Sequence, residues 1–295
     1  MDSTGASEHG TWRIGILWMV LAMALFISMD TMAKHLGQSY PVIQIVWVRY
    51  LVAGTVLALI LNRRLAAKFK SRNMKLQLLR GGLLVATNFL FYTGLRFMPL
   101  AESSAISFVG PLMVTALAVP FLGERVGVRR WASVLVGFAG ALVVVRPGLG
   151  FIDWAALFPL GAAACFAVTA IVTRKLGGLD PVSTTLLLTT FVGAALTSTV
   201  APFFWTPPTA PALALMVCIG LVGVVAHFAI IKAFVAAPAT TVAPYNYTTI
   251  VWATVFGFVV FGDRPDPWTL SGAAIIVGSG LYIYYRERIA RAKVD

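Results

Sequence analysis

Ten apolar runs of about 20 residues divide the chain, each ending at charged residues or at proline and glycine. A helix needs roughly 20 mainly apolar residues to cross a bilayer. No run shows the two-residue alternation of a membrane β-barrel, and backbone groups in hydrocarbon need internal partners. The sequence therefore predicts an all-α membrane protein with ten transmembrane helices, at 13–34, 41–62, 76–97, 100–121, 128–146, 152–174, 181–203, 211–234, 238–261 and 267–285. Prolines mark several starts, namely Pro41, Pro99, Pro147, Pro181, Pro238 and Pro267.

The composition leaves little room for a soluble domain. Of the 295 residues, 59% are apolar and only 12% are charged, whereas soluble domains carry about 25% charged residues. A net charge of +12 is explained by cytoplasmic loops of a membrane protein, so we expect membrane lipids and no nucleic acid as partners.

The chain repeats itself at an offset of 139 to 140 residues. Asn88-Phe89 returns as His227-Phe228, Pro99 returns as Pro238, and Gly123 returns as Gly262 with an acidic residue and an arginine after each glycine. Each copy holds five spans, an odd number, so the second copy enters the membrane from the opposite side. We expect two inverted five-helix repeats at 13–146 and 152–285, an N-terminal tail at 1–12 and a basic tail at 286–295.

The loop charges support this topology. With both termini in the cytoplasm, 18 of the 23 Lys and Arg residues fall on the inner side and four on the outer side, with Arg49 inside a span. This distribution follows the positive-inside rule. The outer four are Lys34, Arg96, Arg146 and Arg264, and the inner side includes the basic connection 63–75.

The sequence lacks the motifs of an enzyme or an ATP-driven pump. No glycine-rich loop is followed by Lys and Ser or Thr. His9, His35 and His227 are far apart and have no Cys or carboxylate cluster beside them, which argues against a metal site. We expect no catalytic residues, no metal and no cofactor.

Asp30 and Arg49 are the ionisable residues deepest in the predicted spans. Such groups usually face a partner or a water-filled cavity. An ion pair between them, with Lys34 as a competing partner one turn from Asp30, is one interpretation. A direct role in substrate binding or proton coupling is the other.

Asn88 and His227 occupy equivalent positions near the middle of spans 3 and 8. Polar residues related by the repeat at mid-depth are expected at a central substrate site, although a hydrogen bond between helices would also explain them. Tyr92, one turn from Asn88, is a further binding candidate.

Span 9 carries a polar and aromatic stripe. At helical spacing, Tyr245, Thr248, Trp252 and Phe256 share one face, and Pro244 removes a backbone hydrogen bond. Span 4 offers Ser103, Ser107 and Pro111 at the matching depth. This wall suits a small molecule with a flat apolar part, and ordinary helix packing is the alternative.

Two other patterns concern packing. Gly137 with Ala141, and Ala274 with Gly278, place small residues four apart in spans 5 and 10, where they let helices approach closely. Dimerisation is the weaker interpretation, so we expect a monomer or a weak homodimer. Glu124 with Arg125, and Asp263 with Arg264, are expected to fix the turns that follow spans 4 and 9.

From residue 14 to 288 the chain resembles the EamA type of the drug/metabolite transporter superfamily. In the first copy the resemblance lies in Pro99 to Pro111, Phe121 to Arg125 and Gly137. In the second copy it lies in Ala243 to Tyr245, Phe261 to Pro265 and Gly272. Arg49 stands where the family often has an arginine. Asp263 replaces the usual glutamate, and Ile250 stands where the first copy has Pro111.

This resemblance implies a transporter of the bacterial cytoplasmic membrane that works by alternating access. Spans 1 to 4 and 6 to 9 would line a central cavity, with spans 5 and 10 outside. Within the superfamily the chain is similar to aromatic amino-acid exporters, so the leading expectation is export of aromatic or large apolar amino acids. Uptake of a flat metabolite such as S-adenosylmethionine or riboflavin is the alternative, and a non-transporting membrane scaffold belongs to another class. A multidrug cation exporter is disfavoured because Asp30 has cationic neighbours in the sequence.

Overall fold

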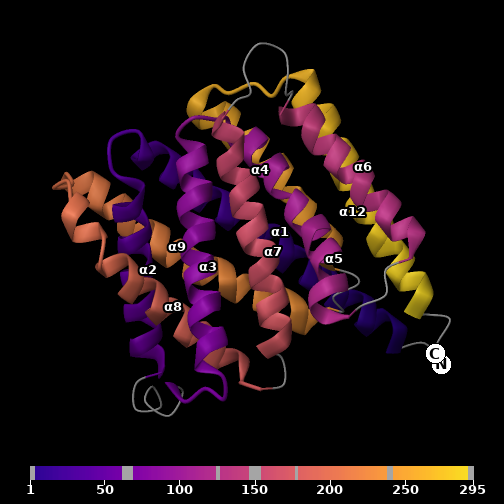
Figure 1. The fold of residues 1–295 in the computed structure, drawn as a ribbon, viewed down its shortest axis with the longest axis horizontal. Coiled ribbons are helices and arrows are strands. Elements are labelled where there is room, and N and C mark those ends of the chain that lie inside the picture. The colour runs from indigo at the N-terminus through magenta and orange to yellow at the C-terminus, as the bar shows by residue number, and fades with distance from the viewer. Residues whose placement is uncertain are drawn as a thin grey trace.

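The computed structural model describes residues 4–61, 69–123, 127–145, 154–176, 179–237 and 242–291, and these contain helices and no strand (Figure 1). The α-helices are α1 (Thr4–Gly37), α2 (Val42–Leu61), α3 (Met74–Leu95), α4 (Leu100–Ser107), α5 (Val109–Leu122), α6 (Val128–Val145), α7 (Leu157–Leu176), α8 (Val182–Ser198), α9 (Ala210–Ala236), α11 (Thr248–Phe256) and α12 (Pro267–Arg291). Short 3₁₀ segments are η3 (Trp154–Ala156), η4 (Ala201–Phe204) and η5 (Ala243–Tyr247), and η6 (Gly257–Phe261) is a π-helix.

The ten-helix architecture is confirmed. Six spans are long and apolar enough to cross a bilayer, and α6 and α8 contain shorter apolar stretches. One of the six spans joins α4 and α5, which meet at Phe108. The segment from η5 through α11 to η6 and the helix α12 complete the ten passes of the described chain. The first helix begins at Thr4, well before its predicted start at residue 13.

Proline and glycine set several helix ends. Pro99 and Pro181 are the N-caps of α4 and α8, and α12 begins at Pro267. Pro147 and Pro238 lie outside the described residues. Gly123 and Gly262, which are equivalent in the two repeats, end α5 and η6 with φ of 68° and 72°. A left-handed residue after a helix favours glycine, so the repeat is visible in the backbone itself.

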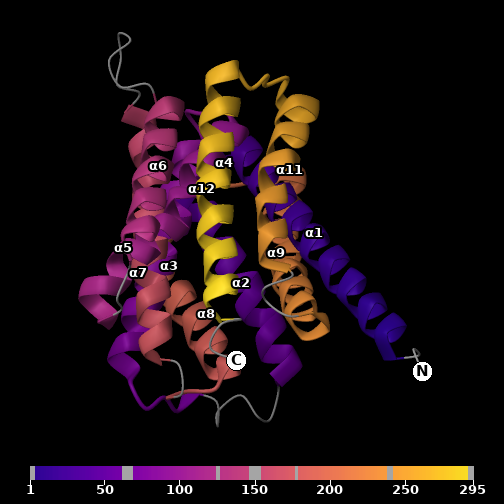
Figure 2. The same ribbon diagram turned by 90° about the vertical axis from the view of Figure 1, so that its right-hand side faces the viewer.

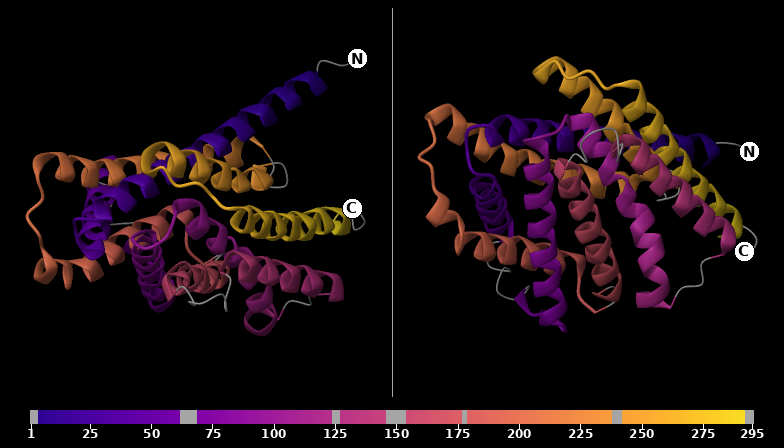
Figure 3. Two further views of the ribbon diagram at one scale, coloured as in Figure 1. Left: turned by 90° about the horizontal axis from the view of Figure 1, so that it is seen from above. Right: turned by 45° about the horizontal axis from the view of Figure 1, so that its top comes forward.

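Equivalent helices of the two repeats make equivalent contacts. α1 packs along α9 and also contacts α11, while α7 packs along α3 and also contacts α5. Since α1 corresponds to α7 in the repeat, each copy reaches across to the other, as Figures 2 and 3 show. The start of α1 and the end of α12 lie at the same end of the bundle. We name this the terminal end. Its assignment to the cytoplasm stays a prediction, and Arg63, Arg64 and Lys68 lie outside the described residues.

α6 and α12 form a peripheral pair on one side of the bundle (Figure 1). Their close approach depends on small residues: a Cβ added at Gly272 would lie 2.7 Å from the backbone oxygen of Gly140. The predicted packing role of Gly137 fits, because a Cβ there would press on the side chains of Leu112 and Ser279. The prediction is wrong for Gly278, because no described atom outside the backbone of its own helix lies within 4 Å of a Cβ added there.

Candidate functional site

A cavity of about 1030 Å³ lies at the centre of the bundle. Small-molecule sites typically occupy about 300–1,000 Å³, so this one accommodates a sizeable ligand. Aromatic and aliphatic side chains form most of its wall. Its polar lining residues are Asp30, Arg49, Tyr50, Arg80, Thr87, Asn88, Ser104, Ser107, Thr115, Thr189, Thr190, His227, Asn246, Tyr247 and Thr249.

The cavity extends toward the terminal end of the bundle. Its lining includes Ile60 near the end of α2 and Thr115 in the second half of the span that α4 and α5 form. α12 contributes Gly280 and Leu281, which corrects the prediction that span 10 packs wholly outside. α12 reaches the cavity because it also contacts α4 and α5. No described residue of α6, the span 5 helix, lines the cavity.

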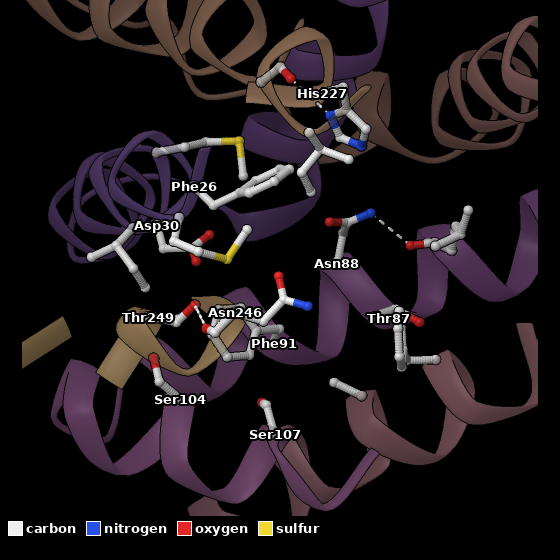
Figure 4. Close-up of a pocket in the computed structure, with 18 of the residues that line it drawn as sticks. Phe26, Asp30, Thr87, Asn88, Phe91, Ser104, Ser107, His227, Asn246 and Thr249 are labelled. Carbon is white, nitrogen blue, oxygen red and sulfur yellow. Dashed lines mark hydrogen bonds between the residues drawn. The ribbon is translucent and has the colours of Figure 1, made fainter. Parts of the chain in front are cut away.

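Asp30 contributes a carboxylate to the cavity wall. Figure 4 shows its side chain near Phe26. It forms no hydrogen bond and no ion pair with any residue that the structure describes. The charge of Arg49 acts on Asp30, but the predicted ion pair between them is not formed. A carboxylate in this position is available to a positively charged ligand.

The guanidinium of Arg49 is held by α3 instead. It donates a short hydrogen bond to Asn88 Oδ1 and a longer one to the Tyr92 hydroxyl, at 3.4 Å. Asn88 is itself oriented, because its Nδ2 donates to the Tyr50 hydroxyl at 3.0 Å and to the carbonyl of Leu84 at 2.7 Å. Tyr92 is fully buried and does not line the cavity. Asn88 and Tyr92 therefore fix the direction in which Arg49 faces the cavity.

Lys34 is also removed from Asp30. Its ammonium lies 2.6 Å from Asp263 Oδ2 and 4.5 Å from the centre of the Phe261 ring. This pair connects the end of α1 to the turn after η6. The predicted pairing of Asp263 with Arg264 is wrong, because Asp263 bonds to Lys34 and Arg264 lies over the Phe258 ring at 5.7 Å. The corresponding Glu124 and Arg125 lie outside the described residues.

Arg80 is a cavity residue that was not among the predicted site residues, because it was counted with the 18 basic residues of the inner side. It lies in the second turn of α3, and its Nε donates to Thr173 at 2.7 Å. A second donor, Nη1, bonds to Thr189. Its position as the fifth residue of the predicted span 76–97 was the only signal, and the basic residues that precede the span made it look like part of the same group.

His227 faces the cavity from α9. Its Nδ1 lies 2.7 Å from the carbonyl of Gly223, which fixes the orientation of the ring. The Phe26 ring meets it edge to face, with centroids 5.1 Å apart. His227 and its repeat equivalent Asn88 thus both line the cavity, as their mid-depth positions led us to expect. Their substrate contacts remain a proposal.

The aromatic stripe of span 9 does not line the cavity. Tyr245 and Trp252 pack against the apolar residues of α1 and α9, and the hydroxyl of Thr248 donates to the carbonyl of Tyr245 at 2.7 Å. The chain around Pro244 forms the 3₁₀ segment η5, so the uniform α-helical spacing assumed from the sequence does not hold there. Residues of the neighbouring face line the cavity in place of the stripe: Pro244, Asn246, Tyr247 and Thr249.

The hydroxyls of span 4 divide in the same way. Ser107 and Ser104 line the cavity, whereas Ser103 is buried behind it. The Ser107 hydroxyl donates to the carbonyl of Ser103 at 2.9 Å. Ser104 is only 3% exposed, and its hydroxyl has no hydrogen-bond partner among the described residues.

One further polar group, Asp180, lies outside the spans and joins the repeats. Its carboxylate accepts hydrogen bonds from the Ser71 hydroxyl, from the backbone N–H of Arg72 at 2.8 Å and from Gln77 Nε2 at 2.8 Å. These donors, with the Ser71 hydroxyl contributing most, hold the pKa of Asp180 below its usual value. The contact links the turn before α3 to the turn before α8.

A ten-helix bundle with repeat-related contacts and a central polar cavity has the architecture of a carrier. The model of the EamA-like transporter family matches the chain twice, at residues 13–146 and 153–285. This chain belongs to that family. The matched segments agree with the two repeats, and the family is one of transporters, so the chain is a multi-pass membrane transporter and not an enzyme.

Curated relatives of this EamA-like transporter align over nearly their whole length. The "S-adenosylmethionine uptake transporter" of Rickettsia bellii is 30% identical over 96% of this chain and 97% of the relative. The "Riboflavin transporter" of Rhizobium johnstonii is 29% identical, covering 96% and 94%. The pseudopaline exporter of Pseudomonas aeruginosa is 27% identical, covering 90% and 94%.

Among solved structures, one aligns with 90% of this chain and 94% of its own, with a TM-score of 0.61 and 18% identity. That likeness concerns the fold alone. None of the relatives named above is an amino-acid exporter, so the aromatic amino-acid subtype finds no specific support in them.

Proposed function

We propose that this EamA-like transporter takes up S-adenosylmethionine, or a closely similar cationic metabolite with a flat ring, into the cell. This is the alternative that the sequence analysis placed behind amino-acid export. The carboxylate of Asp30, which lines the cavity and forms no hydrogen bond or ion pair with the described residues, is the observation that carries the proposal. Names of relatives that align over nearly the full chain support the choice of substrate and the direction.

The charges of the cavity match the charges of this substrate. The charged lining residues are Asp30, Arg49 and Arg80. S-adenosylmethionine carries a sulfonium and an ammonium, which suit Asp30, and one carboxylate, which suits the guanidinium groups. Charges in a poorly solvated site are stabilised only when they are paired. A neutral ligand such as riboflavin would leave all three without an ion pair among the described residues.

The sequence-based argument against cationic ligands no longer holds. Lys34, the cation one turn from Asp30, is bound to Asp263, and Arg49 donates to Asn88 and Tyr92. Neither side chain forms an ion pair with Asp30, although the charge of Arg49 acts on it. The Asp30 carboxylate therefore keeps its hydrogen-bonding capacity for the ligand.

Transport into proteoliposomes tests the proposal. Labelled S-adenosylmethionine, riboflavin, tryptophan and phenylalanine are offered separately, and saturable uptake is expected for S-adenosylmethionine. Two unit charges 4 Å apart interact by about 4 kcal/mol at an effective dielectric constant near 20, and water in the cavity lowers this value. We expect Asp30→Asn to raise the apparent KM for S-adenosylmethionine about tenfold or more, since tenfold corresponds to about 1.4 kcal/mol.

Asp30→Glu, which keeps the charge, should retain most of the uptake and serves as the matched control. If tryptophan or phenylalanine is transported and S-adenosylmethionine is not, the hypothesis of amino-acid transport is supported and this proposal fails. Riboflavin transport that is insensitive to Asp30→Asn would assign the cavity to a neutral flat ligand instead. A protein that folds and gives no saturable flux with any of the four would fit a scaffold.

A further inference from the structure

Asn246 presents an unused carboxamide to the cavity. Figure 4 shows its side chain pointing inward, in the region between Asn88 and Phe91. Its backbone carbonyl accepts a hydrogen bond from the Thr249 hydroxyl at 2.6 Å, which steadies the segment. The side chain itself forms no hydrogen bond with the described residues. A carboxamide that lines a cavity in this way offers one acceptor and two donors to a ligand.

Aromatic side chains line the same cavity as this amide. Phe91, labelled in Figure 4, comes from α3. Phe26 comes from α1, and its ring meets the His227 ring edge to face. Flat heteroaromatic rings stack on such side chains, and each stacked base contributes about 1–3 kcal/mol in nucleic-acid complexes.

Ser104 supplies a second polar group that a ligand in the cavity could use. Its hydroxyl is buried and lacks a partner among the described residues, although its neighbour Ser107 satisfies its own hydroxyl within α4. An unsatisfied buried hydroxyl is unfavourable by about 1–3 kcal/mol. A ring nitrogen of a ligand would accept from it. Ser104 and Asn246 lie on helical segments that line the same cavity.

We infer that Asn246 is the residue that selects the nucleobase of the substrate, by hydrogen-bonding to the amino edge of an aminopurine ring that stacks on Phe91. The inference rests on the proposed function. Asparagine pairs with adenine in two places at once, accepting from the exocyclic amino group and donating to a neighbouring ring nitrogen. Asp30 binds the cationic part of the same molecule, so charge and base are recognised by different residues.

Competition for binding separates the two roles. Purified transporter is loaded with labelled S-adenosylmethionine, which is displaced by 5′-methylthioadenosine or by its analogue in which hydrogen replaces the 6-amino group. One lost hydrogen bond to a ligand typically weakens binding by up to about tenfold. Wild-type protein should prefer the amino compound about tenfold, and Asn246→Ala should bind both compounds about equally.

Companion variants make the outcome specific. Asn246→Asp keeps the acceptor and loses the donor, so part of the preference should remain. Phe91→Leu should weaken both compounds by about the same factor, roughly 5- to 100-fold, because stacking is insensitive to the amino group. Thr93→Val, on α3 but outside the cavity, should leave the preference unchanged.

The possible failures differ. If wild-type protein binds S-adenosylmethionine and Asn246→Ala still prefers the amino compound, the role of Asn246 is refuted while the proposed function stands. If wild-type protein binds no S-adenosylmethionine, the proposed function itself is refuted and the base-selecting role with it. Loss of the preference in Asn246→Ala, with part of it kept in Asn246→Asp and with folding of both variants shown by a single monodisperse peak, supports the inference.

Discussion

The ion pair of Lys34 and Asp263 should give an unequal response when either charge is removed. The two side chains are 10% and 27% exposed. Removing one partner of a buried pair is destabilising by about 3–5 kcal/mol, while exposed pairs contribute about 0–1 kcal/mol. Asp263→Asn leaves the more buried charge of Lys34 behind. Because this pair is only partly buried, we expect the free energy of unfolding to fall by about 2–3 kcal/mol, between the two ranges. Lys34→Met leaves the more exposed carboxylate, and we expect a loss of about 1 kcal/mol.

The free energy of unfolding can be measured by tryptophan fluorescence in detergent micelles that contain increasing fractions of sodium dodecyl sulfate. The double variant should be no less stable than Asp263→Asn alone, because it leaves no unpaired charge. Arg264→Gln is the control, since this exposed side chain forms no ion pair in the described part of the chain. Equal losses in the two single variants that simply add in the double variant would refute this reasoning.

Two more predictions concern packing and acidity. Gly272→Ala should destabilise the protein by about 1–3 kcal/mol in the same assay, because the new Cβ meets the backbone of Gly140. Gly278→Ala is the control: its Cβ meets no described atom outside its own helix backbone, so this variant should be neutral or slightly stabilising. Equal effects of the two substitutions would contradict the packing role of Gly272. Asp180→Asn should lower the melting temperature at pH 7. The melting temperature of this variant should also fall less than that of the wild type when the protein is acidified. The folded pKa of Asp180 is depressed, so its contribution is present above the unfolded pKa of about 3.9 and is lost as pH falls through the folded pKa. If the melting temperatures of the wild type and of Asp180→Asn fall in parallel as the pH is lowered, this role of Asp180 is contradicted.

The fold was predictable because it depends on quantities that add along the chain. Run length, apolar content and the repeat gave the ten passes, and Gly123 and Gly262 carried the repeat into backbone geometry. The start of α1 was misplaced, because the residues from Thr4 are polar and yet continue the helix. A hydropathy boundary marks where lipid begins, and it does not mark where helical hydrogen bonding stops.

The site was less predictable because it depends on which way each helix faces. Asp30, Arg49, Asn88 and His227 were found, since polar groups inside spans rarely face lipid. Span 9 was read as a uniform α-helix, and the 3₁₀ segment at Pro244 brings Asn246 into the cavity where Tyr245 was expected. The partner of Lys34 lies 229 residues away, a pairing that no local pattern reveals.

The two halves of the cavity are chemically unequal. All three charged residues among its lining, Asp30, Arg49 and Arg80, belong to the first repeat, and the second contributes His227, Asn246 and hydroxyl groups. Two identical inverted halves would accept a molecule equally well in either of two opposed poses. Here a cargo with an ionic head and a neutral tail has one preferred pose, which it keeps whichever side of the membrane it entered from. The repeat makes the helix arrangement symmetric, and the different side chains of the two copies orient the ligand within the cavity.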